Sequence, residues 1–154
     1  MKGLHGQTAV KTVLIVDNDP GFMLWLGWAL HEAGWEGLPA KCVNDAFVLL
    51  QNPNIRVDVL IVNFTLERAA ELVEALRSKN PQLKVIALLS DSGPQPEGTP
   101  RADASVQKPG RTGEPTDIEW LREFRRLLSR EPGDPKSEST QLFVSNGKVY
   151  GARN

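Results

Sequence analysis

Polar residues of the types that bind phosphate or metal ions follow four short apolar segments of this 154-residue sequence. The segments are "TVLIV", "VDVLIV", "VIALL" and "ASVQ", and each has the length and composition of a buried strand. The carboxyl ends of parallel strands meet at one edge of a sheet, and the reactive crevice of an open α/β sheet lies outside that edge. We therefore expect a single polar cluster made of Asp17, Asn18, Asp19, Asn63, Ser90 and Lys108.

The elements that would position this cluster alternate between strands and helices, which predicts a doubly wound α/β fold with a parallel sheet covered on both faces. Strands are expected at residues 12–16, 36–41, 57–63, 83–90 and 104–110. Helices are expected at residues 21–35, 44–52, 67–80 and 116–130, with Asn44 and Thr116 as N-caps and Gly34 as a C-terminal stop.

The alternation is interrupted once, and the chain ends in a tail of different composition. Three prolines and two glycines between residues 91 and 103 exclude a helix interior there. A linker follows residue 130, and an Asn146–Gly147 pair between apolar residues predicts a hairpin over 141–150. We expect one domain at 11–130, with residues 131–154 as linker and tail.

The motifs "LIVDNDP", "VDVLIVN", "VIALLS" and "VQKP" together resemble the receiver domain of two-component response regulators. The resemblance covers the predicted domain and implies a five-stranded sheet of order 2-1-3-4-5. In that family's pattern, Asp17 matches the first of two metal-binding acids, Ser90 the phosphate-contacting hydroxyl and Lys108 the lysine before proline. Asn18 stands where the second acid belongs, and Asn63 stands where the phosphoacceptor aspartate belongs.

The two amides remove what phosphoryl transfer to a side chain requires. That reaction needs an anionic oxygen as nucleophile and a magnesium ion that neutralises the phosphoryl oxygens. Magnesium is held through carboxylates, and Asn18 and Asn63 leave Asp17 as the main anionic ligand. We therefore expect weak or absent magnesium binding, no other cofactor and no enzymatic activity. Asp17 and Lys108 are expected to form an ion pair in a permanently closed pocket.

Further departures from the family pattern favour the same interpretation. Ser105 occupies the position, three residues before the lysine, where the family normally carries an aromatic residue. The Pro-rich segment also replaces the fourth helix, which forms half of the face through which receivers usually signal. We interpret the chain as a degenerate receiver, or pseudo-receiver. It would act in signal transduction as a phosphorylation-independent protein–protein interaction module.

Two other functions stay open at this point. The chain could be a receiver that is still switched, by phosphorylation of Asp17 or Asp19 or by a ligand. It could also be a small-ligand-binding α/β protein whose crevice is lined by Asp17, Asn63, Ser90 and Lys108. The lack of a Gly-rich phosphate loop after the first strand counts against this last function.

The first predicted helix carries a second apolar stripe in addition to its core face. Leu24, Trp28, His31 and Trp35 follow one another at spacings of four, three and four residues. A helix that is apolar nearly all round is covered by another surface. The stripe therefore packs against the predicted C-terminal hairpin, or against a protein partner or a second copy in a homodimer, which makes it a candidate interface, or its aromatic residues are ordinary exposed side chains.

Composition excludes several classes of partner. The sequence has 18 basic and 19 acidic side chains, so no field of one sign favours nucleic acid or an anionic membrane. Its one cysteine, Cys42, forms no internal disulfide and no cysteine-type metal site. The N-terminal residues have no continuous apolar region before a small-residue cleavage site, and no apolar segment approaches the length of a membrane span. We expect a soluble cytoplasmic protein.

Overall fold

A computed structural model of the chain describes residues 10–89, 99–109, 116–129, 141–145 and 148–152. Its strands are β1 (Thr12–Val16), β2 (Glu36–Ala40), β3 (Val59–Asn63), β4 (Lys84–Leu89), β5 (Ala104–Gln107), β6 (Gln141–Ser145) and β7 (Lys148–Ala152). Its helices are α1 (Pro20–Glu32), α2 (Val43–Leu49), α3 (Ala69–Lys79) and α4 (Thr116–Ser129).

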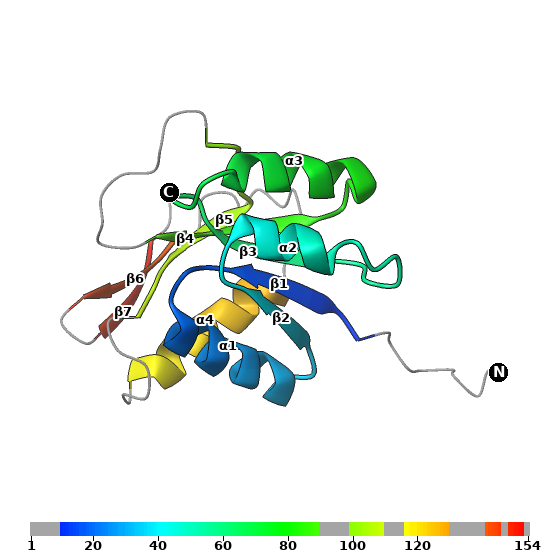
Figure 1. Ribbon diagram of the computed structural model, residues 1–154. Coiled ribbons are helices and arrows are strands. Elements are labelled where there is room, and N and C mark those ends of the chain that lie inside the picture. The colour runs from blue at the N-terminus through cyan, green and yellow to red at the C-terminus, as the bar shows by residue number, and fades with distance from the viewer. Residues whose placement is uncertain (1–9, 90–98, 110–115, 130–140, 146–147, 153–154) are drawn as a thin grey trace.

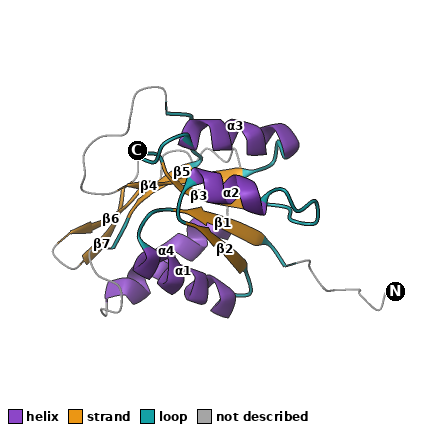
Figure 2. Cartoon of the chain, in the orientation of Figure 1, coloured by secondary structure: helices purple, strands orange, loops and turns teal. Residues whose placement is uncertain are grey.

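The strands form one sheet with helices on both faces, as Figures 1 and 2 show. Strands β1 to β5 are parallel and lie in the order 2-1-3-4-5, which confirms the predicted fold class. Helices α1 and α4 cover one face, and α2 and α3 cover the other. The carboxyl ends of β1, β3 and β5 consequently meet at one edge of the sheet.

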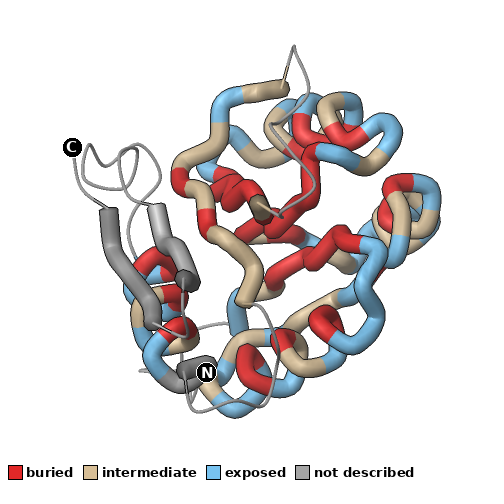
Figure 3. The backbone as a smooth tube through the Cα atoms, turned by 90° about the vertical axis from the view of Figure 1, so that its left-hand side faces the viewer, coloured by how far each residue is buried: buried red, intermediate tan, exposed pale blue. Residues whose placement is uncertain are grey.

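The sheet separates two hydrophobic cores because successive side chains of a strand point to opposite faces. Val13, Ile15 and Ile61 point to the core under α1 and α4, whereas Leu14 and Leu60 point to the core under α2 and α3. All five are fully buried. Figure 3 shows buried backbone along the central strands and mostly exposed positions on the outer sides of the helices.

Helix α1 is bounded by two specific caps. The Asp19 carboxylate accepts a hydrogen bond from the Phe22 N–H at 3.1 Å, and Pro20 follows at the first helical position. At the other end, Gly34 adopts a φ of 89°. The Gly34 and Trp35 N–H groups then bond back to the carbonyls of His31 and Leu30, at 3.0 and 2.8 Å. This is a Schellman motif, and residues with a Cβ rarely adopt the positive φ that Gly34 has in it.

The second helix begins earlier than predicted. Its N-cap is Cys42, whose sulfur accepts from the Asp45 N–H at 3.5 Å, so the predicted Asn44 cap is wrong. Asn44 instead accepts a hydrogen bond from the guanidinium of Arg68. Arg68 precedes α3 with a φ of 69°, pairs with Glu71, and lies over the ring of Phe47. Arg68 thus links α2 to the first turn of α3.

The predicted C-terminal hairpin forms and extends the sheet. Strands β6 and β7 are antiparallel over Gln141–Ser145 and Lys148–Ala152, and β6 pairs in parallel with β5. The Asn146–Gly147 turn lies outside the described residues. So does most of the Pro-rich segment, but residues 99–103, the described part of the β4–β5 connection, contain no helix.

No helix in the described part of the chain is both long and apolar enough to cross a membrane.

Candidate functional site

Three of the polar residues singled out in the sequence meet at the carboxyl edge of the sheet. Asp17, at the end of β1, is fully buried. The Asn63 side-chain amide, at the end of β3, donates to Asp17 Oδ1 at 2.8 Å. The Lys108 ammonium, which follows β5, donates to Asp17 Oδ2 at 2.7 Å. One buried carboxylate therefore has both oxygens engaged by side chains from two other strands.

The orientation of the Asn63 amide is set by a residue that the sequence did not single out. Thr65 donates to Asn63 Oδ1 through its backbone N–H at 3.0 Å and through its hydroxyl at 2.6 Å. With the oxygen accepting from Thr65, the amide NH₂ faces Asp17. An Asn followed two residues later by Thr in a strand-end loop is the turn pattern that could have indicated this contact.

The remaining members of the predicted cluster lie at its rim or beyond it. Asp19 caps α1, and its Oδ2 lies 3.8 Å from the Lys108 ammonium. Asn18 is exposed beside the buried Asp17. Ser90 lies outside the described residues, so the structure does not place its hydroxyl. The cluster that the structure brings together is thus Asp17, Asn63 and Lys108, with Asp19 nearby.

Two aromatic residues, one on α1 and one on α4, fix the position of Lys108. The ammonium lies 5.0 Å from the centroid of the Phe22 ring, a cation–π distance. The indole N–H of Trp120, on α4, donates at 2.8 Å to the carbonyl of Gln107, the residue before Lys108. Trp120 is fully buried and stacks on Phe124.

This donor set fits magnesium poorly, which is the metal that the receiver resemblance implies. Magnesium takes oxygen ligands in near-octahedral geometry, largely from carboxylates. Both Asp17 oxygens already accept from Asn63 and Lys108, and an ammonium lies where a cation would approach. The Asp19 carboxylate is occupied as a helix cap. In the described residues no group of three His, Cys, Asp or Glu side chains is placed to hold a metal ion.

The candidate site is therefore a closed, charge-balanced network. The negative charge of Asp17 is neutralised by Lys108, and the Asn63 amide has partners on both its oxygen and its nitrogen. Such a network rigidifies the strand ends because each buried polar group is satisfied. An amide oxygen lacks the negative charge that a phosphoryl-accepting nucleophile carries.

The stripe on α1 is only partly available as an interface. Leu24 and Trp28 are 77% and 61% exposed, and His31 is also exposed. Trp35 packs partly buried against the core, with Lys11 over its ring, and so does not belong to the open surface. The alternative in which the C-terminal hairpin covers the stripe is wrong. The hairpin adds to the sheet at β5 instead, because a strand edge offers unpaired backbone donors and acceptors.

Comparison with known proteins gives a result for structure only. No protein-family model matches the sequence, and no curated protein matches it. Among solved structures, the chemotaxis response regulator CheY4 of Vibrio cholerae is 22% identical with a TM-score of 0.59, over 77% of this chain and 98% of that one. The signal receiver domain of an HD domain-containing protein from Pseudomonas fluorescens Pf-5 is 20% identical with a TM-score of 0.59, over 78% and 95%. A chain from the complex of histidine kinase ThkA with response regulator protein TrrA is 24% identical with a TM-score of 0.56, over 78% and 100%.

Proposed function

We propose that this chain, which has the fold of response-regulator receiver domains, is a phosphorylation-independent protein–protein interaction module in signal transduction. It would be a non-enzymatic relative of the switchable receivers, with its phosphorylation pocket held in one state.

The contact between Asn63 and Asp17 carries the proposal. In the receiver pattern the end of β3 supplies the nucleophilic carboxylate, and here an amide donates from that position to Asp17 at 2.8 Å. The Lys108 ammonium neutralises the same carboxylate at 2.7 Å. The pocket is therefore stable with neither metal nor phosphate, and no charge is left that phosphorylation would rebalance.

The proposed output surface is the exposed part of α1. The outer edge of β5 is not available for a partner, because this edge, which a five-stranded receiver sheet leaves open, is paired with β6 of this chain. Leu24 and Trp28 are large apolar side chains that stay exposed on α1, next to His31. Exposed aromatic side chains are common anchors of protein interfaces. A protein partner or a second copy of the chain would bury them.

The pocket is tested by intact mass after incubation with acetyl phosphate and magnesium. We expect no phosphoryl adduct on the wild type or on Asn63→Asp alone, and an adduct on the Asn18→Asp, Asn63→Asp double variant. The single variant lacks the second acid that the family uses for magnesium. A phosphoryl adduct on the wild type would refute the proposal and show that the chain is still a switch, with Asp17 or Asp19 as acceptor.

The output surface is tested with Trp28→Ala, measured by light scattering for self-association and by pull-down for partners. Val48→Ala is the matched control, because Val48 is an apolar residue on α2 that is 62% exposed. We expect Trp28→Ala to abolish an association that Val48→Ala retains, with the fold unchanged by circular dichroism. Equal binding by both variants would move the output surface elsewhere.

A further inference from the structure

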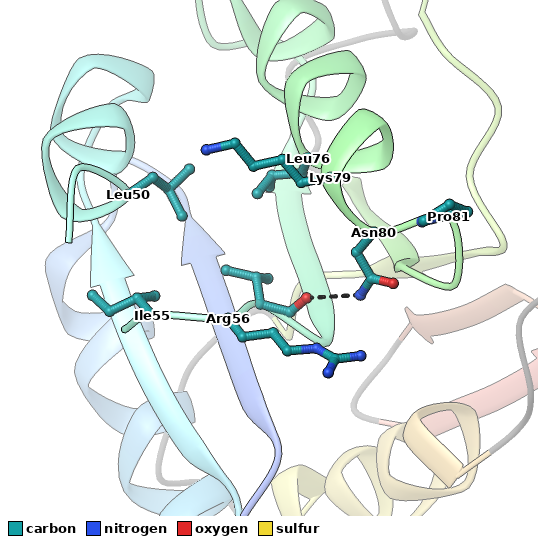
Figure 4. A pocket seen from close by; sticks show the side chains of 8 residues that line it. Leu50, Ile55, Arg56, Leu76, Lys79, Asn80 and Pro81 are labelled. Carbon is teal, nitrogen blue, oxygen red and sulfur yellow. Dashed lines mark hydrogen bonds between the residues drawn. The ribbon is translucent and has the colours of Figure 1, made fainter. Parts of the chain in front are cut away.

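A hollow of about 460 Å³ lies between the C-terminal ends of α2 and α3, but its lining does not select a class of ligand. Leu50, Ile55 and Leu76 form an apolar wall, and the charged ends of Arg56 and Lys79 lie on opposite sides of the hollow (Figure 4). Binding sites orient a ligand through polar groups that converge, which these two side chains do not. The edges of the sheet are more specific, because the free backbone groups of an edge define the strand that can pair with it.

One edge of the sheet, at β2, is protected from further pairing by Pro39. The Glu36 N–H bonds to the Lys11 carbonyl at 2.9 Å, so Glu36 faces β1. The backbone groups of successive residues in a strand point to opposite sides, so Gly37 and Pro39 carry the groups that face outward. Proline has no N–H, and its place on an edge strand is a common protection against the addition of another strand.

The other edge of the sheet, at β7, has no such protection. Strand β7 is the last strand of the sheet (Figure 1), and no described element pairs with its outer side. Residues Lys148–Ala152 include no proline, so every residue of the strand keeps its N–H. An unpaired edge of this kind is a template for pairing with a further strand.

The register of the hairpin identifies which backbone groups of β7 are free. Ser145 pairs with Lys148 across a connection of two residues, so this closing pair is hydrogen-bonded. Hydrogen-bonded pairs alternate with pairs that are not hydrogen-bonded along an antiparallel ladder. Tyr150 is therefore also bonded to β6, whereas Val149 and Gly151 direct their N–H and C=O groups away from the hairpin.

These free groups are complementary to those of an identical strand. When two β7 strands run antiparallel about a two-fold axis at Tyr150, Val149 of each copy lies opposite Gly151 of the other. Each of these pairs can exchange both of its N–H···O=C bonds, so the outward groups of both residues are satisfied. Lys148 then lies opposite Ala152, so the charged residue of β7 does not face its own copy. This match needs no sequence other than that of β7, which favours a second copy of the chain as the partner.

We propose that two copies of this chain pair through their β7 edges and form one continuous sheet. The two-fold arrangement closes on itself, whereas an open-ended arrangement would pair β7 with β2, where Pro39 removes a donor. The formal net charge of −1 per chain gives little repulsion between copies. This inference goes beyond the proposed function, because β7 shares no residue with the Asp17 network or with the exposed part of α1.

Amide hydrogen exchange of the full chain, measured by NMR at several protein concentrations, tests the proposal. We expect the protection of the Val149 and Gly151 amides to rise in step with the fraction of dimer, which sedimentation velocity measures on the same samples. The Gly37 amide, an outward donor of β2, is the internal reference, and its exchange should not depend on concentration. A chain that is monomeric at millimolar concentration, or a dimer in which the Val149 and Gly151 amides stay unprotected, would overturn the proposal.

Substitutions at Ala152 test the register against general electrostatics. Ala152→Glu places a carboxylate opposite Lys148 of the second copy on both sides of the two-fold axis, and Ala152→Lys places like charges there. At low salt we expect the dimer of Ala152→Glu to dissociate at a concentration at least about ten-fold lower than that of Ala152→Lys, with a smaller difference at high salt. Net charge predicts the reverse order, because Ala152→Glu makes each copy more negative and Ala152→Lys makes it neutral. Equal or reversed affinities would contradict the β7 pairing.

Val149→Pro separates the β7 edge from the α1 surface. The substitution removes an outward N–H and keeps the groups that bond to β6, so the dimer should be lost while the Tyr150 amide stays protected. Trp28→Ala should leave the β7 dimer in place, whatever the α1 surface binds. A dimer that survives Val149→Pro and is lost in Trp28→Ala would assign self-association to α1 and overturn the proposal. If proline also loosens the hairpin, the two Ala152 variants decide.

Discussion

Replacing Asn63 with aspartate converts the central hydrogen bond of the site into a repulsion between carboxylates. In the wild type the Asn63 amide donates to Asp17 Oδ1 at 2.8 Å, and Asp17 is fully buried. Aspartate has the same shape but no N–H donor, so the change alters charge and hydrogen bonding with almost no change in packing. We expect Asn63→Asp to lower the free energy of unfolding at pH 7 by about 3 kcal/mol.

Two contributions set that magnitude. Carboxylates whose charges lie about 4 Å apart repel by about 4 kcal/mol at an effective dielectric constant of about 20. The lost hydrogen bond to a charged acceptor adds about 1.5–3 kcal/mol. Lys108, 2.7 Å from Asp17 Oδ2, offsets part of the sum by attracting both anions. The total cost cannot exceed about 4 kcal/mol, because at that point one of the two carboxylates takes up a proton. This value is the free energy of protonating an ordinary carboxylate at pH 7.

Urea unfolding followed by circular dichroism measures this change, with Asn54→Asp as the matched control. Asn54 is exposed in the loop before β3, so the same substitution there should change stability by less than about 0.5 kcal/mol. Magnesium should leave Asn63→Asp unchanged and raise the stability of Asn18→Asp, Asn63→Asp, which has a carboxylate more to bind it. A loss below about 1 kcal/mol for Asn63→Asp would refute the description of the site as a closed, charge-balanced network.

Three further predictions concern single contacts. Lys108→Met leaves the buried Asp17 carboxylate without its cation and should lower the free energy of unfolding, measured in urea, by about 3 kcal/mol. Adding Asp17→Asn to this variant should recover part of the lost stability. Additive effects of the two substitutions would show that the residues are not coupled. Gly34→Ala places a Cβ at a φ of 89° and should cost about 1–2 kcal/mol, with no loss if the Schellman turn is absent. The hydrogen bond from Arg68 lowers the pKa of Glu71, so an NMR titration should give a midpoint for Glu71 below that of an ordinary glutamate. The ion pair is intact above this midpoint and is lost as the pH falls through it. A midpoint that is the same in Arg68→Gln would contradict this cause.

The sequence by itself determined the parallel sheet and the position of its reactive edge. Strand β1 spans Thr12–Val16 as predicted, because a run of β-branched residues ended by turn formers has few other folded solutions. The end of α1 at Gly34 was equally readable, since glycine tolerates the required φ. Strand order and edge geometry then bring Asp17 and Lys108 together, although 91 residues separate them.

The tertiary structure alone decided which partners the C-terminal hairpin and Trp120 find. The hairpin was visible in its local pattern, but its pairing with β5 and not with α1 depends on which unpaired backbone edge is within reach. Trp120 lies in the core with its indole N–H satisfied by the Gln107 carbonyl, and no helical periodicity indicates that partner. Local propensity acts within a few residues, whereas these features depend on packing between segments that are far apart in the chain.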